Sequence, residues 1–250
     1  MDKPVIIMNF SGVYNEEPFA RNPRFTHLDC THLHGTDCYC DEEGQRSIHR
    51  IIAPYPARGI HFIDSGDYHY VTKFWTDKIN TPFSLVLFDH HTDMQPSRWS
   101  GVLSCGGWVK DMLDSNSLLS HVVILGIPED SVATIPEAYR NKVIAITDSK
   151  LHGHAAEQRP LSISEPLYIS IDKDVLDNNS ARTDWDQGTL TLDEMKRVLH
   201  LILKHEKVIG IDICGECPVT LRLFDDDNSL AIDDKANREL LAMFKQQGLF

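Results

Sequence analysis

The chain has 250 residues, of which 42% are hydrophobic and 24% charged, and its formal net charge is −13. Length and composition favour one folded α/β domain, residues 1–250, over a disordered or multidomain chain. The acidic balance argues against nucleic acid and membranes as partners and favours a small cationic molecule or peptide. Because no apolar stretch approaches the ~20 residues that span a bilayer and no export signal precedes the first strand, we expect a cytoplasmic protein with free thiols.

Seven short apolar runs predict buried parallel strands. In chain order they are residues 4–8, 59–63, 84–88, 122–126, 142–146, 167–171 and 208–213. Helices are predicted between them, at residues 71–78, 107–113, 192–205 and 233–247. The third helix begins with a capping box, Thr191 followed three residues later by Glu194. This alternation favours a parallel sheet with helices on both faces.

A polar segment at residues 30–44 contains several cysteines, histidines and aspartates. Three cysteines and two histidines between Cys30 and Asp41 permit a zinc site. Their spacing lacks the Cys-x-x-Cys pairs of structural zinc, so we favour a loop that contacts substrate.

Potential metal ligands follow the predicted strand at residues 84–88. Asp89 comes directly after it, and His91 and Asp93 follow at alternate positions. Alternate residues of an extended chain point to the same side, and ligands bind beyond the carboxyl ends of parallel strands. We therefore expect these three side chains to converge.

The predicted strand at residues 167–171 ends in the same way, with Asp172 and then Asp174. Four clustered carboxylates raise one another's pKa unless divalent cations neutralise them. Oxygen ligands with a minority of imidazole favour Mn²⁺, although Zn²⁺, Fe²⁺ and Co²⁺ accept such ligands as well. The alternative is that the aspartates only cap helices, but their shared spacing at two strand ends favours metal binding.

In this order the two motifs resemble those of the ureohydrolase superfamily, which includes arginases, agmatinases and formiminoglutamases. Its pattern, Asp-x-His-x-Asp and then Ser-x-Asp-x-Asp-x-x-Asp, matches residues 89–93 and 170–177. The superfamily's first ligand is a histidine in a Gly-Gly-Asp-His segment, and His69 is its counterpart here, with one inserted residue. The resemblance covers roughly residues 60–220.

The resemblance implies a three-layer αβα sandwich with a mostly parallel sheet of about eight strands, and a homo-oligomer. It also implies two Mn²⁺ ions. The implied ligand sets are His69, Asp89, Asp93 and Asp172 for one ion, and Asp89, His91, Asp172 and Asp174 for the other. A water between the ions would lose a proton near neutral pH, and Asp93 would orient the resulting hydroxide, which would attack a guanidino carbon to release urea and an amine.

Two departures from the superfamily affect the predicted catalytic residues. Gly215 stands where members carry a glutamate that holds the guanidinium. We predict this role for its neighbour Glu216; the alternative is that the head group of the substrate differs. Arginases also have a proton-carrying histidine after the first motif, which is missing here. We predict that His90 protonates the leaving amine, with His34 and Cys105 as alternatives.

Trp185 and Asp184 lie in the segment after the second motif. An aromatic ring beside a carboxylate can hold a cation by stacking and charge, and we predict that they bind substrate. The alternative for this pair is ordinary packing.

The sequence thus predicts a binuclear manganese hydrolase of a linear amidine, acting on a small guanidino compound or on an arginine side chain. One alternative is deacetylase-like amide hydrolysis on the same fold, usually with a single zinc. The other is a binder that retains the metals without catalysis.

Overall fold

The computed structural model describes residues 4–153, 163–222 and 228–249. Its centre is an eight-stranded sheet with the order β2-β1-β4-β10-β9-β5-β7-β8, in which every pairing is parallel. The strands are β1 Val5–Asn9, β2 Thr26–Asp29, β4 Ile60–Phe62, β5 Phe83–Phe88, β7 Leu119–Ile127, β8 Val143–Thr147, β9 Leu167–Asp172 and β10 Val208–Cys214. The seven predicted strands are confirmed, each within a few residues of its predicted bounds.

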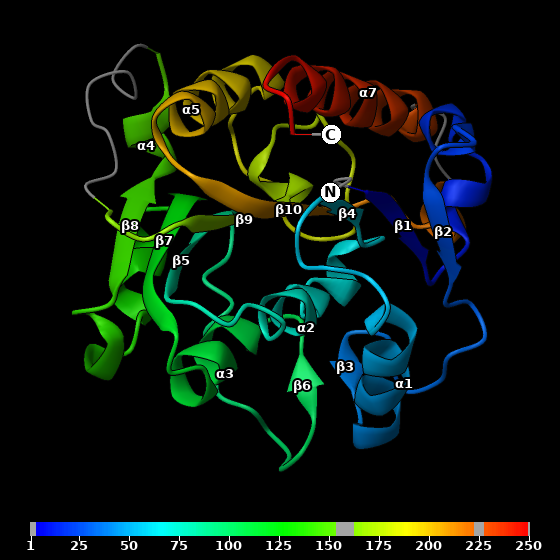
Figure 1. Ribbon diagram of the computed structural model, residues 1–250. Coiled ribbons are helices and arrows are strands. Elements are labelled where there is room, and N and C mark those ends of the chain that lie inside the picture. Colours follow the sequence, from blue (N-terminus) through cyan, green and yellow to red (C-terminus); the bar gives the residue numbers. More distant parts are fainter. Residues whose placement is uncertain (1–3, 154–162, 223–227, 250) are drawn as a thin grey trace.

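Helices cover both faces of this sheet. The α-helices are α1 Glu42–Ile52, α2 Val71–Thr76, α3 Trp108–Ser115, α4 Asp148–Leu151, α5 Leu192–His205, α6 Val219–Arg222 and α7 Ser229–Gln246. Figure 1 shows α5 and α7 on one side of the sheet and α1, α2 and α3 on the other. The predicted three-layer αβα sandwich with a parallel sheet is therefore confirmed.

Strand β5 shows how one sequence serves both layers. Leu85 and Leu87 pack into the core under α2 and α3, whereas Val86 and Phe88 pack into the core under α5 and α7. Alternate residues of a strand point to opposite faces, so a strand buried on both sides is apolar throughout. All six residues of β5 are buried.

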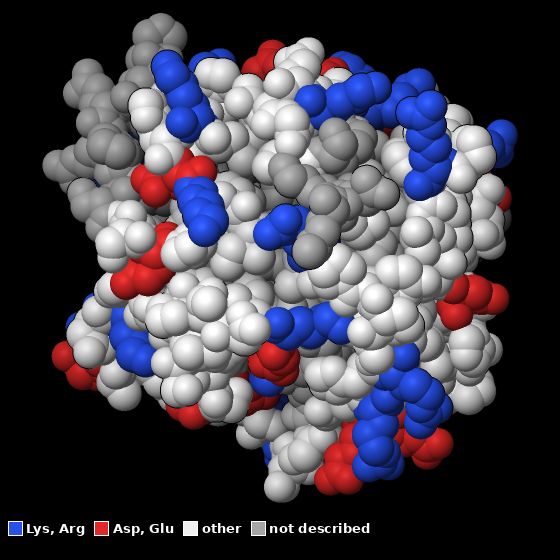
Figure 2. Space-filling view, viewed as in Figure 1, with Lys and Arg blue, Asp and Glu red and all other residues white. Residues whose placement is uncertain are grey.

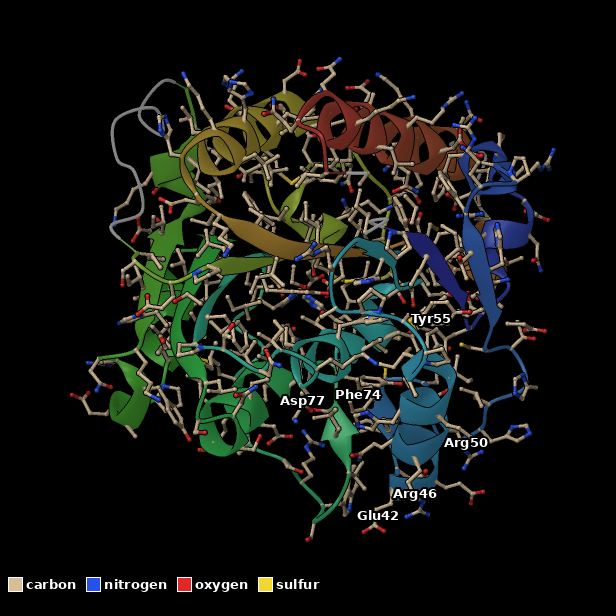
Figure 3. All side chains as sticks on the ribbon, viewed as in Figure 1. Glu42, Arg46, Arg50, Tyr55, Phe74 and Asp77 are labelled. Carbon is tan, nitrogen blue, oxygen red and sulfur yellow. The ribbon has the colours of Figure 1, made fainter. Side chains whose placement is uncertain are left out.

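The sequence did not predict β2 or α1. Strand β2 lies at the edge of the sheet and buries only Leu28. Helix α1 begins inside the segment that was expected to be a loop, where the Asp41 side chain accepts hydrogen bonds from the first turn. Its charged residues Glu42, Arg46 and Arg50 are exposed on its outer side (Figure 3), which masks the helical pattern of its few buried residues.

Short 3-10 turns and a small second sheet connect these elements. The turns are η1 Val13–Asn15, η2 Pro18–Arg21, η3 Gly66–Tyr68, η4 Asp130–Thr134, η5 Glu137–Tyr139 and η7 Lys173–Val175. The second sheet pairs β3, Tyr39–Cys40, with β6, Leu103–Ser104, in antiparallel fashion. The capping box at the start of α5 is present as predicted.

The order of the strands determines which loops lie side by side and can form a site. The four central strands β4, β10, β9 and β5 are neighbours, so the segments that follow them meet at one edge of the sheet. In the described ranges no helix is both long and apolar enough to cross a membrane.

Candidate metal centre

Two neighbouring strand ends supply the first carboxylates. Strands β5 and β9 are paired, with Phe88 opposite Ile171. Asp89 directly follows β5, and Asp172 is the last residue of β9, so the two carboxylates lie at neighbouring strand ends. Both side chains are buried. The sequence therefore places two carboxylates side by side, away from bulk water, without a long loop.

His69 lies among these carboxylates. It follows the turn η3, and its Nδ1 is 3.4 Å from Asp89 Oδ2, 3.1 Å from Asp93 Oδ2 and 3.3 Å from Asp172 Oδ2. The turn thus accommodates the inserted residue noted in the sequence. Burial opposes protonation of His69, but the hydrogen bond to Asp93 and the three negative charges raise its pKa to about 10.

His91 occupies the other side of Asp89. Its Nδ1 is 2.8 Å from Asp174 Oδ2 and 3.6 Å from Asp89 Oδ1. The ligand atoms of His69, Asp89 and Asp93 lie within 4.8 Å of one another, and so do those of Asp89, His91 and Asp174. Asp89 is common to both groups.

The charges of this cluster favour a bound cation. Burial raises the pKa of Asp89 well above its usual range, and the carboxylates of Asp93 and Asp174 raise it further. Its Oδ2 is buried and has no hydrogen-bond partner among the described residues. Carboxylate oxygens and two imidazoles are ligands that fit Mn²⁺ and related divalent ions, and such ions would remove the repulsion.

Asp93 is fixed by a residue that the sequence did not indicate. Its backbone has a φ of 49°, and its Oδ2 accepts a hydrogen bond of 2.5 Å from Trp108 Nε1 at the start of α3. The indole thereby holds the carboxylate towards His69. The contact joins residues 15 positions apart through tertiary packing, so the spacing of the motif could not reveal it.

Behind His69, buried hydroxyl and carboxyl groups determine its orientation. Its Nε2 lies 2.9 Å from Ser170 Oγ, and Ser170 Oγ donates a 2.5 Å hydrogen bond to Asp212 Oδ1. Because Ser170 donates to Asp212, it accepts from Nε2–H, and Nδ1 is the nitrogen that faces the carboxylates. Burial raises the pKa of Asp212 to about 6, although the hydrogen bond from Ser170 lowers it.

A cavity of about 240 Å³ opens onto the centre. The residues lining it are Gly66, His69, Asp89, His91, Thr92, Asp93, Gln95, Cys105, Gly106, Ser131, Thr134, Asp172, Asp174 and Trp185. All six predicted ligands are among them. Four polar lining residues were not predicted: Thr92 is a variable position inside the first motif, Gln95 follows that motif, and Ser131 and Thr134 come from the separate turn η4.

Comparisons with known proteins agree with this geometry. A family model described as the arginase family matches residues 59–220, which include every predicted ligand. The chain belongs to the arginase family. Its members are hydrolases that act on C–N bonds of amidines, so the predicted enzyme class is confirmed.

Individual proteins resemble the chain over most of its length. An uncharacterized protein from Thermotoga maritima is 30% identical over 211 residues, which are 84% of this chain and 78% of that protein. Proclavaminate amidino hydrolase from Streptomyces clavuligerus has a similar fold, with a TM-score of 0.71 at 15% identity, covering 99% of this chain and 92% of that one. Formiminoglutamase from Trypanosoma cruzi, solved with Mn²⁺, gives a TM-score of 0.63 at 12% identity, covering 94% and 92%. The arginase-family fold implies a divalent metal centre.

One residue predicted for the arginase-family site lies elsewhere. Glu216 is fully buried, its Oε2 is 2.6 Å from Lys173 Nζ, and it does not line the described cavity. The cause is Gly215, whose φ is 87° and whose backbone lies against Asp172. A Cβ on Gly215 would be 2.5 Å from Asp172 Oδ1, so the backbone occupies the space beside the centre and Glu216 pairs with Lys173 instead.

His90 also lies outside the described lining of the cavity. It is half-buried, burial lowers its pKa, and its backbone N–H donates a 3.0 Å hydrogen bond to Asp174 Oδ1. Of the two alternative proton donors, Cys105 lines the cavity and His34 does not.

Trp185 and Asp184 lie at and near the cavity wall. The Trp185 ring meets the His91 ring edge to face at 5.9 Å, and its Nε1 donates a 3.1 Å hydrogen bond to Asp67 Oδ1. Burial, followed by the charge of Asp67, raises the pKa of Asp184 to about 8. Their proposed part in substrate binding stays a prediction.

Proposed function

We propose that this chain is a manganese-dependent amidino hydrolase that cleaves a small amidine or guanidino compound, or an arginine side chain, at a binuclear centre. The observation that carries the proposal is the convergence of six ligand side chains on one cavity. His69, Asp89, Asp93 and Asp172 would hold one cation, and Asp89, His91, Asp172 and Asp174 the other.

The cations would activate water and polarise the amidine carbon. Asp93 is the residue that would handle the proton, since its carboxylate is held in the cavity by Trp108 and lies 3.1 Å from His69. It would accept the proton of the attacking water and pass it to the departing amine. A guanidino substrate then gives urea and an amine, and a formimino substrate gives formamide and an amine.

The cavity favours a compact reacting group. Its volume of about 240 Å³ lies below the ~300–1,000 Å³ of sites that enclose drug-sized ligands. Trp185 supplies an apolar face, and Thr92, Gln95 and Ser131 supply groups that can donate and accept hydrogen bonds. Since Glu216 does not line the cavity, these groups are the candidates for binding the amidine group of the substrate.

Two ligand groups that share Asp89 favour the binuclear hydrolase over the deacetylase-like alternative. A single-zinc amide hydrolase needs one group of about three protein ligands. Here the second group, with His91 and Asp174, is equally complete.

The test is product release by Mn²⁺-loaded protein from arginine, agmatine, guanidino acids, formiminoglutamate and an arginine-containing peptide. Urea or formamide should form from at least one member. The product should fall by about a thousandfold in Asp93→Asn, because an amide neither ligates as strongly nor accepts a proton. Asp193→Asn, at an exposed position on α5, is the matched control and should retain activity.

If no amidine is turned over while two Mn²⁺ per chain are bound, the proposal fails. Release of acetate from acetylated amines under the same conditions would support amide hydrolysis instead.

A further inference from the structure

We propose that Cys38, Cys105 and Asp67 form a third metal site, selective for a thiolate-binding divalent cation such as Zn²⁺, at the wall of the cavity that opens onto the metal centre. It shares no ligand with the two groups assigned above. Its test does not depend on which amidine, if any, the enzyme cleaves.

The small second sheet brings the two thiols together. Strands β3 and β6 pair Tyr39 with Ser104, and just beyond this pair the Cys105 N–H donates a 2.9 Å hydrogen bond to the Cys38 carbonyl. The two residues are thus cross-strand neighbours at the end of a ladder.

The carboxylate comes from a third element. Asp67 is in the turn η3, and its Oδ1 is 2.8 Å from Cys38 Sγ. The ligand atoms of all three residues lie within 4.8 Å of one another. A tetrahedral zinc with Zn–S bonds of about 2.3 Å places two sulfurs about 3.8 Å apart, so this grouping suits zinc without large movement.

The charge around the three residues favours a bound cation. Burial raises the pKa of Asp37 and of Asp184, and the nearby charge of Asp67 raises both further. Within the described ranges no lysine, arginine or histidine forms an ion pair with any of these three aspartates. One oxygen of Asp184, Oδ1, is buried and has no hydrogen-bond partner there.

Ligand chemistry separates this site from the main centre. Thiolate sulfur selects Zn²⁺ and Co²⁺ over Mn²⁺, whereas the main centre offers carboxylates and imidazoles. Binding would release the two thiol protons to solvent. The ion would clamp the β3–β6 sheet to η3, whose next residue is His69, and so would stiffen the wall that carries Cys105 and Trp185.

The experiment titrates fully reduced, Mn²⁺-loaded protein with Co²⁺ and follows the thiolate-to-cobalt charge-transfer absorption in the near ultraviolet. One equivalent should produce this band. It should be lost in Cys38→Ser and in Cys105→Ser, while each variant still binds two Mn²⁺, which shows that it is folded. Asp67→Asn keeps both thiols and should weaken Co²⁺ binding at least tenfold.

Two other cysteines provide the controls. Cys30→Ser changes a buried thiol outside the trio and should keep the band. Cys214 is the critical comparison, because its Sγ lies 3.1 Å from Asp172 Oδ2 and could report cobalt in the main centre. A band that vanishes in Cys214→Ser and survives in Cys38→Ser would overturn the proposal, as would reduced wild-type protein with no band.

Discussion

Ser170 lies behind the metal centre rather than in it, two residues before Asp172 on the same strand. Its hydroxyl links His69 Nε2 to Asp212. Because Nε2 contacts this hydroxyl, the other ring nitrogen, Nδ1, faces the carboxylates. Such outer contacts fix the tautomer and the ring orientation of a ligand, and they raise its basicity. At the scale of single residues, the centre therefore depends on groups that touch no metal.

Ser170→Ala should lower the affinity for the Mn²⁺ held by His69 by about ten- to a hundredfold, because the imidazole loses the acceptor that orients it. Calorimetric titration of metal-free protein with Mn²⁺ measures this. Ser84→Ala is the matched control, since Ser84 is equally buried on the neighbouring strand and its hydroxyl has no described partner. Equal losses in the two variants would assign the effect to packing alone.

Five of the six ligands could be predicted from the sequence because they follow buried runs of strand residues at period two, whereas His69 follows the turn η3 and was found only through the resemblance of its segment. Asp89 and Asp172 illustrate this, since the structure brings them and the other four proposed ligands to one cavity. Trp108 could not be predicted, because its contact with Asp93 arises from how α3 packs against the loop after β5. Glu216 was expected in the cavity because it is next to the position of the superfamily glutamate. The spacing of the motif does not reveal that Gly215 adopts a positive φ, and the prediction could not take this into account.

At the scale of elements, a buried ionic cluster joins the second motif to the carboxyl-terminal helices. Lys173 in η7 pairs with Glu216 after β10, and its Nζ is 3.7 Å from Asp233 Oδ1 on α7. Glu216 also accepts a 2.8 Å hydrogen bond from Asn237 on α7, and Arg222 on α6 pairs with Glu17 at 2.8 Å. These contacts fix the position of Lys173, which lies between two proposed metal ligands.

Lys173→Met should lower the free energy of unfolding by about 3–5 kcal/mol, because it leaves Glu216 buried without its cation. Urea unfolding of the metal-loaded protein measures the loss. The double variant Lys173→Met/Glu216→Gln should recover part of it, since Glu216 then no longer carries a buried charge without its nearest cation. Lys110→Met breaks a pair of similar length, 2.7 Å, at the surface and should cost about 1 kcal/mol or less.

The elements themselves were predictable to the extent that packing leaves a pattern in the sequence. Strands such as β5, buried on both faces, read as continuous apolar runs. Strand β2 has one buried residue and α1 has a mostly charged surface, so neither carries a strong signal. The β3–β6 pairing joins segments about 60 residues apart, and two-residue strands are too short to show any period.

At the scale of the whole molecule, the position of the negative charges affects cation binding more than their total number does. Figure 2 shows lysine and arginine side chains dispersed over the visible face, several of them beside aspartate or glutamate side chains. The carboxylates of the centre, by contrast, are concentrated beyond the carboxyl ends of β5 and β9. Two divalent cations would change the net charge from −13 to −13 + 4 = −9, with the whole change confined to that edge.

Removal of metal should therefore destabilise the entire fold. At a Mn²⁺ concentration of 100 Kd, one site contributes about 2.7 kcal/mol, which corresponds to roughly 5–10 °C in Tm for a chain of this size. Thermal melting with and without a chelator measures the difference. Asp89→Asn should abolish the response and should melt above wild type when both are metal-free, because one repelling charge is gone. A wild-type Tm that is unchanged by chelation would contradict a centre of this kind.

Gly215 also limits how the specificity of this enzyme can be redesigned. With a φ of 87° and no room for a Cβ beside Asp172, the position accepts no larger side chain without movement of the backbone. The glutamate that superfamily members carry there cannot be grafted by a single replacement. An engineer who wants arginase-like selectivity would have to remodel the whole turn from Cys214 to Pro218, whereas the loops that bear Thr92, Ser131 and Trp185 offer a more tractable starting point.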